Sequence, residues 1–272
     1  MKALIFLLWS FILTGNAGEL IRVAGSSTVL PVIAEAARHY HTAHPDVSIA
    51  VSGGGSGVGI ATVLQGGADL GMSSREPTPA EWTRLRQRRI RLVAIGRDGI
   101  AVAVSKAVVE GGVDALSLAQ IAAIYRGEIR NWKTLGGPDR TILVIDKERG
   151  RGTRHVFAKV VLGHAMARAP GASVVAGSNN EMQALIGRSD NAIGMLSYAW
   201  LNDKVRGLPL RINGRDIPPA AETIRNGGYP LRRDLFLLVP ETARAAVIDF
   251  VQFLLSPKGQ SLVRQCGYLP LP

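Results

Sequence analysis

The chain has 272 residues, of which 47% are hydrophobic and 31 are glycine. This composition excludes a disordered chain, and the length is sufficient to bury two separate cores. A single cysteine, Cys266, excludes an intrachain disulfide, and the formal net charge of +11 favours anionic partners.

A basic chain can bind nucleic acid, an anionic membrane surface or a small anionic ligand. The densest basic run holds five arginines between residues 84 and 91, just after Trp82. Aromatic residues are not interleaved with these arginines for base stacking, and no nucleic-acid motif accompanies them. We therefore interpret the run as a solvated helix face and expect no nucleic-acid partner.

The first residues have the pattern of a secretory signal peptide. Lys2 precedes an apolar stretch from Ala3 to Leu13, and the small residues that follow predict cleavage after Ala17. The apolar stretch is shorter than the roughly 20 residues that a membrane-spanning helix needs. No cysteine near the cleavage point could carry a lipid, so the sequence predicts a periplasmic protein that is not a lipoprotein, with residues 1–17 as its signal peptide.

Beyond residue 17, strand-like and helix-like segments alternate along the chain. Strands are predicted at 20–24, 47–51, 69–72, 90–95, 99–105, 141–146, 192–196 and 236–239. Helices are predicted from about residue 29, at 57–64, from 79, at 118–125, 153–162, 181–186 and 242–255, and after Pro257. Such alternation predicts an α/β protein with a mostly parallel sheet and helices on both faces.

No low-complexity linker divides the chain, so any two lobes must be joined by closely packed crossings. The crossings are predicted near Arg97-Asp98 and between Thr223 and Gly228. Lobe I then comprises residues 18–97 and 226–272, and lobe II comprises residues 98–225. A chain that leaves one lobe and returns to it forms a cleft with a two-stranded hinge.

Three clusters of small hydroxyl and glycine residues follow predicted strands in the first half of the chain. They are Gly25-Ser26-Ser27-Thr28, the glycine-rich loop 53–59 with Ser56, and Ser73-Ser74-Arg75. Hydroxyls and free N–H groups at helix starts bind anions, and glycines let the backbone approach them closely. For Arg75, a guanidinium that grips two ligand oxygens and a surface ion pair with Glu76 are equally open.

A fourth cluster opens the predicted helix at residue 153. Lys147, Arg149, Arg151 and Arg154 surround Gly150, Gly152 and Thr153, with Asp146 and Glu148 between them. Repulsion among four cations must be offset by acids or by a bound anion. A ligand loop and a solvated mixed-charge turn are both open for this segment.

The sequence offers no other chemistry of comparable strength. Loop 53–59 lacks the lysine of a P-loop, the glycine spacing of a dinucleotide site and the second glycine of a nucleophile elbow. His41 and His44 lack further ligands, so no metal, no cofactor and no catalytic set is predicted.

Taken in order, the clusters resemble the PstS-like phosphate-binding proteins of ABC importers. The matching motifs run over nearly the whole chain beyond the signal: Gly25-Ser-Ser-Thr28, Gly53-Gly-Gly-Ser-Gly-Val-Gly59, Ala68-Asp-Leu-Gly-Met-Ser-Ser-Arg75, Asp98-Gly-Ile-Ala-Val102, Tyr125-Arg-Gly-Glu-Ile-Arg-Asn-Trp132, Gly150-Arg-Gly-Thr-Arg154, Ala192-Ile-Gly194, Asn226-Gly-Gly-Tyr-Pro-Leu231 and Leu254-Leu-Ser-Pro-Lys-Gly-Gln260.

This resemblance implies a type II periplasmic-binding-protein fold, in which two α/β lobes with two hinge crossovers close on phosphate. It implies a monomer that binds phosphate or a similar oxyanion and delivers it to an ABC transporter permease, and it implies no enzymatic activity. The implied ligand-binding residues are Ser27, Thr28, Ser56, Ser74, Arg75, Lys147, Arg151, Gly152 and Thr153.

The chain departs from the family pattern at three of these positions. Lys147 and Arg151 stand where the family usually has arginine and serine, and Ser74 stands where well-studied members have aspartate. A carboxylate at that place rejects sulfate, so its absence leaves phosphate and sulfate both open. An accessory or sensory domain without phosphate binding, and a phosphate-ester hydrolase, are the alternative functions.

Overall fold

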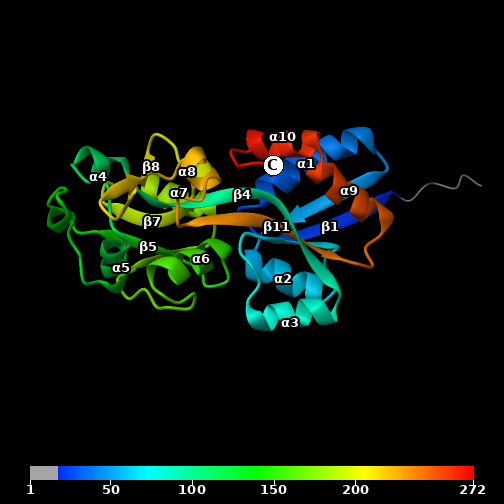
Figure 1. Cartoon of the computed structure of the whole chain (residues 1–272), viewed down its shortest axis with the longest axis horizontal. Helices are drawn as coiled ribbons and strands as arrows, with labels where there is room; N and C mark the ends of the chain where they lie inside the picture. The colour runs from blue at the N-terminus through cyan, green and yellow to red at the C-terminus, as the bar shows by residue number, and fades with distance from the viewer. Residues whose placement is uncertain (1–17) are drawn as a thin grey trace, which may run out of the picture.

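The computed structural model describes residues 18–272, so the predicted signal peptide lies outside the described residues. Figure 1 shows two lobes side by side, joined by long strands that run through both of them. The first half of the described chain forms β1 (Glu19–Gly25), α1 (Leu30–Ala43), β2 (Val47–Ser52), α2 (Ser56–Leu64), β3 (Leu70–Ser73), α3 (Pro79–Gln87), β4 (Ile90–Ser105), α4 (Lys106–Glu110) and α5 (Leu118–Arg126).

The second half begins with the short 3₁₀ helix η1 (Trp132–Leu135) and returns to the first lobe at its end. Its further elements are β5 (Leu143–Lys147), α6 (Gly152–Val161), β6 (Val174–Ala176), α7 (Asn179–Gly187), β7 (Ala192–Ser197), η2 (Tyr198–Trp200), β8 (Val205–Leu208), β9 (Leu210–Ile212), β10 (Arg215–Ile217), α8 (Ala221–Arg225), β11 (Arg232–Pro240), α9 (Ala245–Leu255) and α10 (Pro257–Gln265).

The main sheet is mixed, whereas the sequence predicted a mostly parallel one. Its strand order is β2-β1-β3-β11-β4-β7-β5-β6, with β8 paired to β4. Strands β1, β2 and β3 pair in parallel, as do β5, β6 and β7, but β4 and β11 pair antiparallel with each other and with their other neighbours. The chain leaves the first lobe along β4 and comes back along β11, which requires these two strands to run in opposite directions.

Strand β4 is continuous, although two strands were predicted with a break near Arg97-Asp98. Charged residues rarely lie inside a buried strand unless they are paired. Here Arg97 donates from Nε to Asp234 Oδ1 at 2.9 Å, and Asp98 pairs with Arg233, both partners lying on β11. Because the neighbouring strand neutralises both charges, the strand passes through the predicted crossing without interruption.

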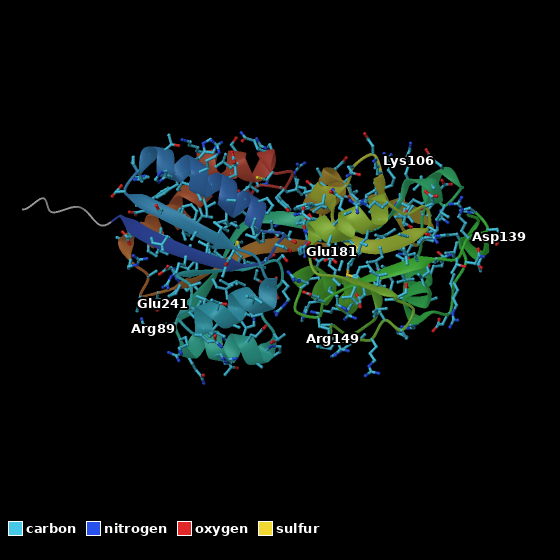
Figure 2. All side chains as sticks on the ribbon, turned by 180° about the vertical axis from the view of Figure 1, so that it is seen from behind. Arg89, Lys106, Asp139, Arg149, Glu181 and Glu241 are labelled. Carbon is cyan, nitrogen blue, oxygen red and sulfur yellow. The ribbon has the colours of Figure 1, made fainter. Side chains whose placement is uncertain are left out.

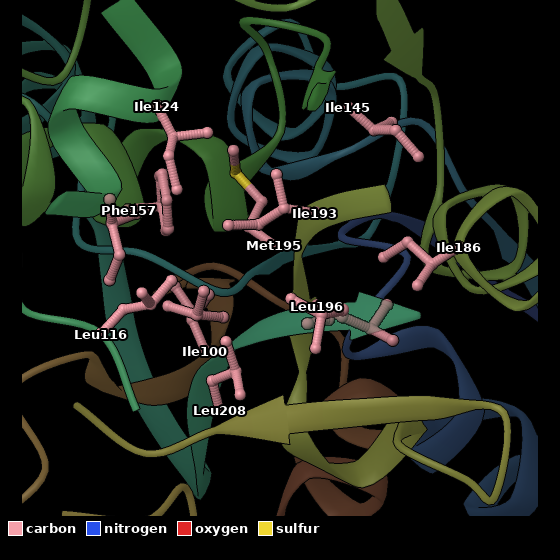
Figure 3. Packing of buried hydrophobic residues seen from close by; sticks show 14 of the residues in the cluster. Ile100, Leu116, Ile124, Ile145, Phe157, Ile186, Ile193, Met195, Leu196 and Leu208 are labelled. Atoms are coloured by element: carbon pink, nitrogen blue, oxygen red, sulfur yellow. The ribbon is translucent and has the colours of Figure 1, made fainter. Parts of the chain in front are cut away.

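Each lobe has a core of its own. In the first lobe, α1 turns the face with Val32, Ile33 and Tyr40 onto the sheet, where it packs with residues of β11 and α9. In the second lobe, the core gathers residues of β4, β7, α5, α6 and α7, among them Phe157 and Ile193 (Figure 3). A smaller cluster under α2 and α3 covers the other face of the first half of the sheet.

The returning chain also contributes to the second core. Tyr229 and Leu231, which the sequence assigned to lobe I, pack there, and Tyr229 donates from its hydroxyl to Ile100 O at 3.0 Å. The residue bounds of the two lobes stay a prediction. Within residues 18–272, none of the helices combines the length and the apolar character that crossing a membrane requires.

Most charged side chains lie on the surface of the lobes. In Figure 2, Arg89 and Glu241 lie together on the first lobe, where Arg89 Nε is 2.9 Å from Glu241 Oε2. Arg149 and Glu181 lie on the second lobe near its junction with the first. The charged groups of the interlobe region are the exception, because several of them are buried.

Candidate functional site

The N-terminal ends of four helices meet between the two lobes. Thr28 lies just before α1, Ser56 opens α2, Gly152 and Thr153 open α6, and Asn179 opens α7. The first N–H groups of a helix have no partner inside the helix, and the helix dipole makes this end partly positive. Loops from both lobes therefore present donors and positive potential to one place.

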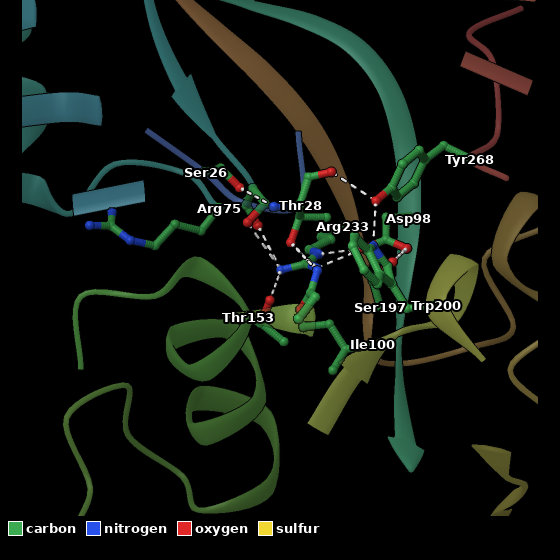
Figure 4. A network of polar contacts seen from close by, with 12 residues as sticks. Ser26, Thr28, Arg75, Asp98, Ile100, Thr153, Ser197, Trp200, Arg233 and Tyr268 are labelled. Atoms are coloured by element: carbon green, nitrogen blue, oxygen red, sulfur yellow. Dashed lines mark hydrogen bonds and ion pairs between the residues drawn. The ribbon is translucent and has the colours of Figure 1, made fainter. Parts of the chain in front are cut away.

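A buried arginine, Arg233 of β11, lies at the centre of this region (Figure 4). Its Nη1 donates to Thr153 Oγ1 at 2.9 Å and to Ser74 Oγ at 3.2 Å, and its Nη2 donates to Thr28 Oγ1 at 3.3 Å. We call Thr28, Ser56, Ser74 and Thr153 the hydroxyl cluster. One guanidinium thus contacts hydroxyls from three separate loops and from both lobes.

Asp98 of β4 fixes the position of Arg233. Asp98 Oδ2 accepts from Arg233 Nε at 3.0 Å and Nη2 at 2.7 Å, while Ser197 Oγ donates to Oδ1 at 2.8 Å. Complete burial raises the pKa of Asp98, and the charge and hydrogen bonds of Arg233 oppose that rise. The pair lies directly across β4 and β11, so the two strands that join the lobes hold the guanidinium in place.

The hydroxyls of Ser56 and Ser74 pack directly against the start of α6. Ser56 Oγ accepts from the backbone N–H of Ser74 at 3.0 Å and lies 3.3 Å from Ser74 Oγ. A Cβ atom added at Gly152 would collide with both hydroxyl oxygens, so only glycine permits this approach. Nearby, the N–H of Gly57 donates to Gly150 O at 3.1 Å, which ties the glycine loops of the two lobes together.

Lys147 is a second buried cation beside the hydroxyl cluster. Its Nζ donates to Asn179 Oδ1 at 2.7 Å and to Ser178 O at 3.1 Å, and Asn179 Nδ2 donates to Thr28 Oγ1 at 3.2 Å. Among residues 18–272 no carboxylate lies within ion-pair distance of Lys147. Burial, followed by the charges of Arg233 and Arg151, lowers the pKa of Lys147 to about 7 against the smaller effects of Glu181 and Asp98.

Three of the predicted site residues lie outside these contacts. Arg75 is directed away from Arg233 (Figure 4) and forms a two-pronged pair with Glu81, at 2.7 and 2.8 Å. Arg151 lies against Gly55 and donates to Glu148 Oε2 from both Nε and Nη2. The side chain of Ser27 takes part in none of the hydrogen bonds found in the described chain. Each of the two arginines is thus already paired with an acid close to it in the sequence: Arg75 with Glu81, six residues later, and Arg151 with Glu148, three residues earlier.

The structure instead adds three residues that sequence reasoning missed, namely Arg233, Asp98 and Asn179. Residues of one strand alternate between its two faces, so Arg233 shares a face with the buried Leu235. That spacing is the signal that could have placed Arg233 inside the protein. Nothing local in the sequence indicates that Asp98 faces it, because this contact depends on the pairing of strands more than 130 residues apart.

The arrangement suits a ligand that accepts hydrogen bonds. Thr28 Oγ1 accepts from Asn179 and from Arg233, which uses both of its lone pairs, so its O–H has to be donated to something else. No hydrogen bond within residues 18–272 uses that O–H as a donor. Hydroxyl donors, helix N-termini and two buried cations are the groups that bind a tetrahedral oxyanion.

Two α/β lobes joined by two long strands, with oxyanion donors gathered between them, define a binding protein of the type II periplasmic architecture. The model of the PBP superfamily domain matches residues 14–258. The chain belongs to the PBP superfamily and, within it, to the family of the phosphate-binding proteins PstS. The predicted family and fold class are thereby confirmed, and this is a family of transport proteins rather than of enzymes.

Relatives and solved structures support this assignment over most of the chain. The phosphate-binding protein PstS of Bacillus subtilis is 30% identical over 261 residues, which cover 94% of this chain and 82% of the relative. One similar solved structure is a Clostridium perfringens protein described as a phosphate ABC transporter substrate-binding protein with bound phosphate. It is 30% identical, has a TM-score of 0.83, and the match covers 93% of this chain and all of that one. An ABC-type phosphate transport receptor from Vibrio cholerae is also 30% identical over 93% of this chain and the whole of its own, with a TM-score of 0.75.

Proposed function

We propose that this protein binds inorganic phosphate between its lobes and delivers it to the permease of an ABC importer. The ligand contacts Thr28, Ser56, Ser74, Gly152 and Thr153, with Lys147 and Arg233 supplying positive charge. Arg75 and Arg151 are proposed to shape the surroundings of the site, because Glu81 and Glu148 pair with them. Ser27 contributes through its backbone in the loop before α1.

The observation that carries this proposal is the direction in which the hydroxyls must donate. Arg233 and Asn179 occupy both lone pairs of Thr28 Oγ1, and Arg233 also donates to Ser74 and Thr153. A hydroxyl that accepts from a fixed N–H group directs its own hydrogen elsewhere. Arg233 thus turns hydroxyls of both lobes into donors, which match the acceptor oxygens of phosphate.

The charges of the site support an anionic ligand as well. Asp98 offsets part of the charge of Arg233, while Lys147 is bound only to neutral oxygens. An unpaired buried ammonium is costly, and a bound anion stabilises its charged form. Phosphate binding therefore favours proton uptake by Lys147 and offsets the desolvation of the site.

The remaining parts of the proposal rest on the family. We propose that residues 1–17 direct export, that the mature chain acts as a monomer in the periplasm, and that it releases its ligand unchanged without a cofactor or metal. Within residues 18–272, no group of three or more histidine, cysteine or acidic side chains could hold a metal ion. The proposal includes no nucleic-acid contact by the five arginines between residues 84 and 91.

Isothermal titration calorimetry of residues 18–272, stripped of anions by unfolding and refolding, tests the proposal. Phosphate is expected to bind, and Thr28→Val to weaken binding at least about tenfold, since a hydrogen bond to a charged group contributes about 1.5–3 kcal/mol. Thr42→Val is the matched control, because Thr42 is exposed on α1 and bonds only to Arg38 O. No heat with phosphate or sulfate would instead support an accessory domain, and an equal loss in both variants would remove Thr28 from the site.

A further inference from the structure

A groove of about 820 Å³ opens between the lobes, on the side of α3 and α6. Its walls begin where the loops of the proposed phosphate site end. Arg75 and Glu76 follow Ser74, His155 follows Thr153 by two residues, and all three line the groove. Arg233 lines it as well and contacts the hydroxyl cluster, so one guanidinium belongs to both places. The groove therefore adjoins the proposed site at Arg233 and is much larger than orthophosphate.

The groove carries an excess of positive charge. Arg75 and Arg97 are neutralised by Glu81 and Asp234, which also line it. Three further cations, Arg149, Lys159 and Arg232, are exposed and have no ion-pair partner within residues 18–272.

Two further titratable groups of the groove leave most of this excess in place. Burial, followed by the charge of Arg75, lowers the pKa of His155 to about 4, so this histidine is neutral at pH 7. Glu76 is the one groove carboxylate outside these pairs. Three cations against one acid leave a net attraction for negative charge beyond the orthophosphate position.

We infer that the groove binds the additional phosphoryl groups of a condensed phosphate such as pyrophosphate or tripolyphosphate, with one end at Arg233 and the hydroxyl cluster. This inference rests on the proposed function, because the same cluster holds the terminal phosphate. Unpaired Arg and Lys side chains spaced along a groove suit a linear chain of anionic groups better than a single phosphate. Orthophosphate, in contrast, is too small to contact the outer three cations.

The test compares orthophosphate and tripolyphosphate by calorimetry at one fixed ionic strength. The variant Arg149→Ala/Lys159→Ala/Arg232→Ala is expected to weaken tripolyphosphate binding at least about tenfold and orthophosphate binding less than about threefold, since exposed charge pairs contribute modestly one by one. The control variant Arg188→Ala/Lys204→Ala/Arg206→Ala removes the same charge from exposed positions outside the groove. It is expected to change both affinities by less than about threefold.

The possible outcomes separate the two claims. Orthophosphate binding without tripolyphosphate binding overturns the groove inference and leaves the proposed function intact. Equal losses of tripolyphosphate affinity in the groove and control variants also overturn it, because the loss would then follow from the lower net charge and not from the groove residues. Phenyl phosphate binding more tightly than tripolyphosphate would assign the groove to organic esters and contradict a condensed phosphate. Binding of neither inorganic anion overturns the proposed function together with the inference.

Discussion

Two buried arginines lie at or near the junction of the lobes, and their surroundings differ. Arg233 and Arg75 are 6% and 7% exposed, and each holds a carboxylate with two of its nitrogen atoms. Arg233 has N–H groups left over, and these contact three hydroxyls. The remaining side-chain hydrogen bond of Arg75 goes to the carbonyl oxygen of Glu76.

This difference shows that burial and charge alone do not identify a binding arginine. Glu81 lies at the third position of α3, in a capping box with Thr78, so its pair with Arg75 fastens a helix start to the preceding loop. Asp98 lies across the sheet from Arg233, so their pair fixes a guanidinium between the lobes. The first pair stabilises one lobe, and the second holds a guanidinium at the proposed site.

The largest expected effect is that of Arg233→Met. Removing one partner of a buried ion pair leaves Asp98 uncompensated, which should lower the free energy of unfolding by about 3–5 kcal/mol in urea titrations. Phosphate binding should weaken at least about hundredfold, because the hydroxyls lose both their orientation and a charge.

The double variant Asp98→Leu/Arg233→Met keeps this test decisive if the single variant unfolds. It should recover most of the lost stability, since no buried charge is left alone, and it should still fail to bind phosphate. Tight phosphate binding by either variant would show that Arg233 serves the fold only.

Lys147 gives the next largest effect, through the pH dependence of stability. Its pKa of about 7 in the folded protein lies below the ordinary lysine value of 10.5. Between these values the unfolded chain binds a proton that the folded protein does not, so the Lys147 contribution to stability rises with pH across this window. Below about pH 7 both states are protonated, and the contribution is constant at its least favourable value.

Comparison of Lys147→Met with the unmodified chain isolates this contribution. In phosphate-free buffer, the difference in free energy of unfolding, unmodified chain minus variant, should increase by about 1 kcal/mol per pH unit from pH 7 to 10. Urea titrations at four pH values measure it. A difference that stays constant with pH would mean that Lys147 keeps its proton throughout.

Arg75→Met tests the other buried arginine of this comparison. Its pair with Glu81 is only partly buried, so the expected loss of stability is about 1–2 kcal/mol, smaller than for Arg233→Met. Phosphate affinity should change less than about threefold, because Arg75 makes no contact with the hydroxyl cluster. A tenfold loss of affinity with unchanged stability would return Arg75 to the ligand-binding residues.

The smallest expected effect concerns the choice between phosphate and sulfate. The oxygens of Asp98 are occupied by Arg233 and Ser197, and Ser74 brings a hydroxyl where a carboxylate could accept a ligand proton. Ser74→Asp should therefore raise the preference for phosphate over sulfate by about tenfold, by leaving a carboxylate facing the sulfate oxygens. Calorimetry with both anions measures the ratio, and an unchanged ratio would show that Ser74 does not face the ligand.

Much of the fold follows from local patterns in the sequence. The first helix, predicted from about residue 29, begins at Leu30, and the strand predicted at 192–196 spans Ala192–Ser197. Short elements such as β6, β9, β10 and α8 were not predicted, because three to five residues carry too little periodicity. The continuity of β4 could not be predicted, since it depends on charges that lie on β11.

The candidate site divides in the same way. Glycine and hydroxyl loops after strands have a local signature, and the structure brings Thr28, Ser56, Ser74, Gly152 and Thr153 to one place. Whether an arginine faces them depends on the position of the acid that pairs with it. Glu81 and Glu148 lie close in sequence to Arg75 and Arg151 and hold them, whereas the partner of Arg233 is found only through the pairing of two distant strands.

A crystal structure of residues 18–272 grown with phosphate tests the central claim most directly. We predict phosphate oxygens at hydrogen-bonding distance, roughly 2.6–3.2 Å, from the hydroxyls of Thr28, Ser74 and Thr153, with Arg233 still paired to Asp98. Phosphate bound instead at Arg75, with Glu81 displaced and the hydroxyl cluster unliganded, would contradict the account.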